Sequence, residues 1–402
     1  MALAAAVLAW QRPWAGPASS ADEDQQEVVI GSDARAVLGR QLADLSTATD
    51  RAAFAAAAGA GEQARRFADE AWSAREALGV QEVTLRYVEG GDRVERSDGS
   101  TLARVQVSWR VDDTSPIAGT AVRGALVGLR LEPRADGTFD VLGTESAGDP
   151  LPLWLAGDLR VSGDDRARAI VVDGGVPGVD TLALARRAAD VARASLPGVD
   201  EPVTVVSAAD RSLSAALIGR TEQQIAPIAG VTTTVDGTAE TARVVVLNPD
   251  LFAAMDDRSR QVVVSHEAVH VLTDVVGTQM PPWVVEGFAD YVALRDDDAP
   301  LSVSAGQVLR QVAAAGAPDE LPGPAEFSAA DGPGLSAVYE SAWLVFRMLA
   351  EDVSHERLLA FHEAVRTGAD TDAAAREHLG DDLAGITARW QDYLEKSAST
   401  VS

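Results

Sequence analysis

Two histidines and a glutamate stand together in a stretch that is otherwise almost free of charge. His266, Glu267 and His270 lie within five residues, and Glu267 is the only Asp, Glu, Lys or Arg between Arg260 and Asp274. On a helix, residues four apart share one face, so the two imidazoles would be stacked there. Imidazoles at this spacing can bind one zinc ion, and the glutamate beside them can act as a general base without binding it. The pattern predicts a metal site on a buried helix. The plainer alternative is a pair of core or surface histidines beside an exposed glutamate.

A catalytic zinc site needs a third protein ligand and one open position. The next histidine along the chain is His355, but the apolar segment 281–291 supplies Glu286 and Asp290, four residues apart, and Pro282 suits the first turn of a helix. A buried carboxylate without a partner costs several kcal/mol, so two of them call for a cation or strong donors. We expect Glu286 to complete the site and Asp290 to accept a hydrogen bond from a ligand histidine. A solvent-facing pair of carboxylates is the alternative.

The motif His266-Glu267-x-x-His270 followed by Glu286-Gly-Phe-Ala-Asp290 resembles the gluzincin class of zinc metallopeptidases, the thermolysin-like or peptidase MA superfamily. The resemblance covers about residues 175–402. It implies one Zn²⁺ per chain, bound by the two histidines and Glu286. It also implies that Glu267 activates a water molecule and that Asp290 supports a histidine.

Members of this class also use a group that stabilises the oxyanion of the tetrahedral intermediate. The resemblance makes Tyr339, on the helix expected after the site, the first candidate, with ordinary helix packing as the alternative. His355, His362 and His378 compete for the role, and each is expected at the surface of the C-terminal helices.

The class further implies an edge strand that pairs with an extended peptide substrate. The run Arg243–Leu247, followed by Asn248, occupies the corresponding place in the sequence. Val246 and Asn248 are therefore expected to contact the substrate by β-addition. The alternative is a buried sheet strand without substrate contact.

Composition limits the function further. The chain has 402 residues, enough for two or three domains, and carries 34 Lys plus Arg against 61 Asp plus Glu, for a formal charge of −27. Such a surface repels phosphate backbones, so nucleic acid is not an expected partner. Cysteine is absent, so any metal must be held by His, Asp or Glu.

The fold class predicted from periodicity is α+β. Residues 1–21 contain a short apolar run typical of a signal peptide or a truncated membrane anchor, which predicts export and possible attachment to the cell surface. Residues 28–150 read as helices followed by a curved antiparallel sheet and resemble the NTF2-like cone in element order and length. Residues 151–175 are expected to be linker strands. Residues 176–402 form the predicted metallopeptidase domain, a mixed α/β lobe followed by a mostly helical lobe.

Within that domain, β runs are expected at 202–206 and 241–247, with a Thr/Gly loop before the second. The helix that carries the two histidines is expected to begin at Asp256 or Asp257 and to stop at Gly277.

The leading functional hypothesis is zinc-dependent hydrolysis of a peptide bond in a peptide or protein substrate, by a metal-activated water with Glu267 as general base. The competing hypothesis is a non-enzymatic exported binding or scaffold protein with a structural zinc site. A metal hydrolase with another substrate is a third.

Overall fold

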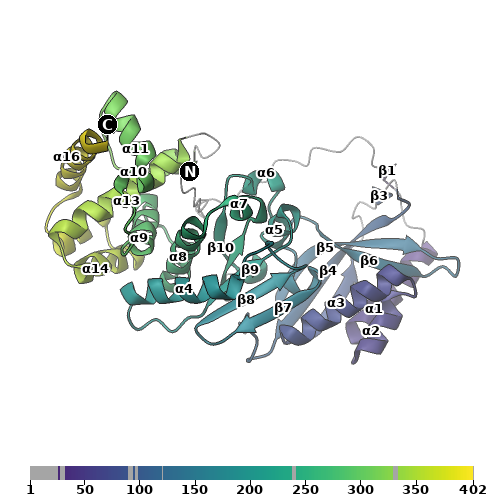
Figure 1. Ribbon diagram of the computed structural model, residues 1–402. Helices are drawn as coiled ribbons and strands as arrows, with labels where there is room; N and C mark the ends of the chain where they lie inside the picture. The colour runs from purple at the N-terminus through teal and green to yellow at the C-terminus, as the bar shows by residue number, and fades with distance from the viewer. Residues whose placement is uncertain are drawn as a thin grey trace.

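The computed structural model in Figure 1 describes residues 26–27, 32–88, 94–95, 98–119, 121–237, 241–328 and 334–401. The predicted signal or anchor at residues 1–21 lies outside them. Among the helices of the described residues, none combines the length and the apolar character that a membrane crossing requires.

The first part of the chain places three helices before an antiparallel sheet. The helices are α1 (Ser32–Thr47), α2 (Arg51–Ala58) and α3 (Glu62–Ala77). The long strands are β2 (Val80–Tyr87), β4 (Thr101–Val111), β5 (Arg123–Pro133) and β6 (Phe139–Ser146), and the two-residue strands are β1 (Gln26–Glu27) and β3 (Val94–Glu95). The strand order is β1-β3-β4-β5-β6, and β2 also pairs with β4. In β4 every second side chain is buried, as a sheet with one covered face requires.

A second, mixed sheet occupies the middle of the molecule (Figure 1). Its order is β10-β11-β9-β8-β7, with the central strands β11, β9 and β8 parallel and the two outer strands antiparallel to their neighbours. The strands are β7 (Leu159–Gly163), β8 (Ala167–Val172), β9 (Val203–Ser207), β10 (Gly230–Thr234) and β11 (Arg243–Leu247). The connecting helices are α4 (Thr181–Ser195), α5 (Arg211–Leu217), α6 (Glu222–Ile225) and α7 (Pro249–Ala254), with short 3-10 turns η1 (Leu153–Leu155) and η2 (Val235–Gly237).

This sheet corrects two sequence-based predictions. The strands expected in a linker are β7 and β8, and β8 pairs with β9 along its length, so they belong to the sheet. The segment expected as a Thr/Gly loop contains β10, an outer strand. Its β-branched residues Val231 to Thr234 suit a pleated strand, and pairing with β11 outweighs the flanking glycine.

The remainder of the chain is helical. It contains α8 (Asp257–Thr273), α9 (Pro282–Ala293), α10 (Leu301–Ser304), α11 (Gly306–Ala315), α12 (Pro324–Ser328), α13 (Leu335–Asp352), α14 (His355–Arg366), α15 (Thr371–Ala374), a π-helical turn (Ala375–Leu379) and α16 (Leu383–Val401). Three helices, two sheets and this helical region together confirm the α+β class.

Helix α8 is central to the arrangement because it packs against α4, α9 and the mixed sheet. Asp256 caps its start by accepting a hydrogen bond from the Ser259 N–H at 2.7 Å. The helix ends at Thr273, before the predicted stop at Gly277, because Asp274 takes a left-handed backbone conformation. The Asp274 carboxylate is held there by Arg243 of β11, at 2.7 Å. All residues from 262 to 272 are buried.

Helix α9 crosses α8 on one side and α13 on the other. Pro282 occupies its first turn, as predicted, where a missing N–H costs nothing. Gly287 is needed where α9 meets α13, because a Cβ there would lie 2.5 Å from the Ala342 carbonyl oxygen. The two helices therefore approach more closely than any other residue at position 287 would allow.

Candidate metal centre

Three side chains from α8 and α9 converge on one point. His266 Nε2 lies 2.9 Å from His270 Nε2 and 3.2 Å from Glu286 Oε2, and His270 Nε2 lies 3.4 Å from the same oxygen. Atoms that bind one zinc ion at about 2.0–2.1 Å in tetrahedral geometry lie roughly 3.3 Å from one another. The observed triangle therefore has the dimensions of a metal site. Within the described chain, this is the one group of three His, Cys, Asp or Glu side chains arranged to hold an ion.

Asp290 orients one of the two imidazoles. His266 Nδ1 lies 2.7 Å from Asp290 Oδ1, so the Nδ1–H donates to the carboxylate. This bond leaves the lone pair on Nε2, the atom that belongs to the triangle. A histidine ligand held by a carboxylate through its other nitrogen is the usual outer-shell arrangement of a zinc site. The position of Asp290 is the one expected from its spacing after Glu286.

Burial excludes surface histidines and an exposed glutamate, although it is compatible with a pair of core histidines. His266 and Glu267 are 0% exposed and His270 is 1% exposed, so neither the histidines nor the glutamate lie at the surface. Glu286 is also buried. The alternative of a solvent-facing Glu286 and Asp290 pair fails for the same reason, since Asp290 is directed to His266.

Glu267 is held beside the triangle but outside it. Its Oε2 accepts a hydrogen bond from the Thr232 hydroxyl of β10 at 2.7 Å. Its Oε1 is buried and has no hydrogen-bond partner among the residues that the structure describes. A buried carboxylate oxygen without a donor is costly, and the ion-paired Asp236 also has one, so it is the position of Glu267 Oε1 beside the triangle that makes it available to a ligand or a reacting molecule.

The proton affinities follow from this crowding. Burial raises the pKa of Glu267, although the charges of His266 and His270 oppose the rise. Burial would lower the pKa of His266, but Asp290 and Glu286 outweigh it and raise that pKa well above its usual value. Burial would raise the pKa of Glu286, but His270 and His266 hold it below the usual range.

Tyr339 of α13 lies next to the site. Its ring centroid is 6.3 Å from that of His266, and the Tyr339 side chain is buried. Phe327 of α12 packs edge-on against it at 5.2 Å. The structure therefore brings Tyr339 to the metal centre, and its chemical role remains a prediction.

Of the other histidines, one is placed differently from the expectation. His362 was expected at the surface, but it is buried and stacks on Phe288 at 4.2 Å, where burial lowers its pKa to about 3. The reason is that α14 covers the apolar face of α9. His355 is half-buried and donates from Nε2 to the Ser195 carbonyl oxygen at 2.7 Å. His378 is half-buried.

The predicted substrate strand was wrong. β11, which carries Val246, lies between β10 and β9, so its backbone is paired on both sides and cannot accept an added strand. Asn248 caps α7 through its Oδ1 and donates from Nδ2 to the Ile225 carbonyl oxygen at 2.8 Å, so its polar atoms are used inside the fold. β10 is the outer strand.

Thr232 is a site residue that sequence reasoning missed. It is fully buried on β10 and bonds to Glu267, 35 residues further along the chain. The β-branched run around it was the available signal, because such a run favours a strand over a loop.

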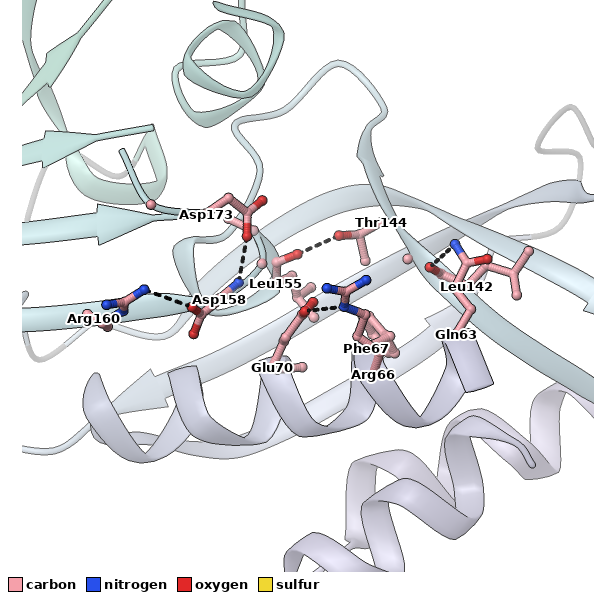
Figure 2. Close-up of a pocket in the computed structure, with 15 residues that line it drawn as sticks. Gln63, Arg66, Phe67, Glu70, Leu142, Thr144, Leu155, Asp158, Arg160 and Asp173 are labelled. Atoms are coloured by element: carbon pink, nitrogen blue, oxygen red, sulfur yellow. Dashed lines mark hydrogen bonds and ion pairs between the residues drawn. The ribbon is translucent and has the colours of Figure 1, made fainter. Parts of the chain in front are cut away.

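A groove between α3 and the mixed sheet is a second possible location for a functional site (Figure 2). It has a volume of about 680 Å³ and lies where α3 faces η1, β6 and the β7–β8 hairpin. Its charged groups pair with one another: Arg66 with Glu70 at 3.1 Å, and Arg160 with Asp158 at 3.4 Å. Asp173 accepts from the Asp158 backbone N–H. The groove therefore lacks the converging, unpaired groups of the metal centre.

Comparison of the sequence with models of protein families gave no match, and comparison with curated proteins gave none either. The site geometry is therefore the basis of the functional assignment.

Proposed function

We propose that this protein is a zinc metallopeptidase of the gluzincin type, with His266, His270 and Glu286 as the zinc ligands. The observation that carries the proposal is the position of Glu267. It is fully buried beside the ligand triangle, contributes no atom to it, and keeps one carboxylate oxygen free of hydrogen bonds within the described chain.

When bound, zinc lowers the pKa of a coordinated water to about 7 and polarises a carbonyl oxygen. The residues of the chain supply the remaining functions. His266 and His270 present Nε2, and Asp290 keeps His266 in the tautomer that can do so. Glu267 Oε1 takes a proton from the attacking water and returns it to the leaving amine.

We assign substrate pairing to β10. This strand has one strand neighbour among the described residues, but all five of its residues are buried, so an extended peptide can pair with its outer edge only after that edge is uncovered. Because Thr232 of this strand contacts Glu267, a peptide paired there would lie beside the proposed general base. Tyr339, adjacent to His266, is the proposed oxyanion-stabilising residue.

The competing function is a scaffold with a structural zinc site. Structural zinc is almost always closed by four protein ligands, whereas three are grouped here among the residues that the structure covers. A structural site also has no use for a buried glutamate next to the ligands. Both features favour the enzyme.

The test is metal analysis combined with a cleavage assay. Protein prepared free of metal and then loaded with zinc is expected to hold about one zinc ion per chain and to cleave an unfolded protein such as reduced casein. A chelator should abolish cleavage, and zinc but not magnesium should restore it. Stoichiometric zinc without any cleavage would favour the scaffold, and absence of zinc binding would contradict both functions.

A further inference from the structure

We propose that Thr232 of β10 is a positioning residue that fixes the carboxylate of Glu267 for proton transfer. The inference rests on the proposed function, and it adds a residue outside the two helices of the motif.

The contact is double. The Thr232 hydroxyl oxygen lies 2.7 Å from Glu267 Oε2 and 3.0 Å from the Glu267 carbonyl oxygen. One hydroxyl thus touches both the side chain and the backbone of the same residue. This arrangement fixes the carboxylate relative to the turn of α8 that also carries His266 and His270.

The strand is shaped for this close contact. Residues two apart on a strand point to the same face, so Gly230 and Thr232 both face α8. A Cβ at Gly230 would lie 3.2 Å from Val263 Cγ1 and 3.5 Å from Glu267 Cγ, which is tighter than ordinary packing at the first atom. The missing side chain lets α8 approach β10, and the threonine that follows reaches the carboxylate.

The two oxygens of Glu267 consequently differ. Oε2 is engaged by Thr232, whereas Oε1 has no partner within the described part of the chain. Without the hydroxyl, Oε2 would also be buried and unbonded, and the carboxylate would gain by rotating toward any other donor. Thr232 therefore determines which oxygen stays available and where it lies.

The experiment compares Thr232→Val, which keeps the shape and removes the hydroxyl, with Thr232→Ser, which keeps the hydroxyl. Thr204→Val is the matched control, because Thr204 is a buried threonine on β9 of the same sheet and has no bond to the centre. Zinc content, kcat, KM and a crystal structure of each zinc-loaded protein are measured.

Displacement of a catalytic group by about 1 Å can cost about 100-fold in rate, so kcat of Thr232→Val is expected to fall by up to about that factor. Zinc content and KM should stay unchanged, Thr232→Ser should recover most of kcat, and the control should match the wild type. The Glu267 carboxylate should leave its observed position in the Val variant and keep it in the Ser variant.

An unchanged carboxylate position together with an unchanged kcat in Thr232→Val would overturn the inference. Loss of zinc or equal losses in the Val and Ser variants would also overturn it, since they indicate a purely structural role. If the Val variant does not fold, Thr232→Ala serves in its place. An inactive wild type would refute the proposed function instead, and the crystal structures would still decide whether Thr232 positions Glu267.

Discussion

The described residues bury charge in several places, and two of these places differ in how that charge is balanced. One is the metal centre between α8 and α9. The other is a single ion pair between Arg123 of β5 and Asp236 of η2, where Nη1 and Oδ2 are 2.9 Å apart and both side chains are almost completely buried. The pair joins the antiparallel sheet to the end of β10, and Arg123 also donates to the Ile117 carbonyl oxygen.

In the ion pair, the chain supplies its own cation. A guanidinium stays charged at any ordinary pH, so Asp236 has a permanent partner. In the metal centre, Glu286 and Glu267 meet imidazoles, whose charge depends on bound protons, and two Nε2 atoms face each other at 2.9 Å. Burial of charge therefore does not by itself mark a functional site. The candidate site differs because the lone pairs of its imidazole nitrogens and carboxylate oxygens have no positively charged Arg or Lys side chain as a partner among the described residues.

Removal of a ligand should have the largest effect. Glu286→Ala is expected to lose zinc and, with it, all hydrolysis, because two imidazoles remain in place of three ligands. Zinc at 100 times its dissociation constant stabilises a folded protein by about 2.7 kcal/mol, so the wild type should melt at a higher temperature when zinc is added. Elemental analysis and thermal melts with and without zinc check this. A fully loaded Glu286→Ala protein would contradict the ligand assignment.

Glu267→Gln should separate catalysis from binding. An amide cannot take the proton, so kcat is expected to fall by about 10²- to 10⁴-fold, the usual contribution of general acid–base catalysis. Zinc content and the melting temperature gained with zinc should match the wild type, since Glu267 contributes no ligand atom. Steady-state kinetics beside metal analysis are the measurements, and unchanged turnover would refute the assigned role.

The ion pair should respond in stability and not in metal binding. Arg123→Met leaves Asp236 buried without its cation, and breaking a buried pair in this way costs about 3–5 kcal/mol. Adding Asp236→Asn removes the second charge and should recover much of that loss. Asparagine tolerates the left-handed backbone found at position 236, where φ is 57°. Urea unfolding of the single and double variants measures both, and a double variant no more stable than Arg123→Met would show that charge is not the cause.

The smallest effect concerns another buried carboxylate, that of Glu340, which follows Tyr339 in the sequence. Glu340 Oε2 accepts hydrogen bonds from the backbone N–H groups of Gln307 and Val308, both at 2.8 Å, at the start of α11. Burial nevertheless raises its pKa to about 7. The folded protein therefore holds a proton here that the unfolded chain releases nearer pH 4.5, so this contribution to stability is lost as pH rises through about 7.

Glu340→Gln should remove that dependence. Between about pH 5 and pH 8, its melting temperature is expected to fall less than that of the wild type, because an amide has no proton to lose over this range. Parallel curves for the two proteins would show that Glu340 titrates normally.

The sequence was most informative where function depends on spacing within one helix. The separation of His266 from His270, and of Glu286 from Asp290, is enough to place each pair on one face, and the apolar flanks predict burial. The structure brings all four together as expected. Helix periodicity is a local property, so the face on which these residues lie does not depend on contacts with distant parts of the chain.

What the sequence did not reveal depends on distant partners. The order of strands in the mixed sheet places β11 inside and β10 outside, and no local pattern distinguishes the two. Thr232 reaches a residue 35 positions away, and Arg123 reaches one 113 positions away. His362 is similar, because its burial depends on the packing of α14 against α9. Such contacts are decided by tertiary packing and not by periodicity.

Gly287 links the position of Glu286 to helix α13, which contributes none of the three side chains of the triangle. Glu286 precedes this glycine, and α9 rests there directly on the carbonyl of Ala342 in α13. The distance from the Glu286 carboxylate to the two imidazoles therefore depends on how closely α9 packs against α13. An added methyl group at position 287 would push these helices apart and shift Glu286 relative to the two histidines, so the geometry of the candidate site depends on the packing of α9 against α13 as well as on the three side chains themselves.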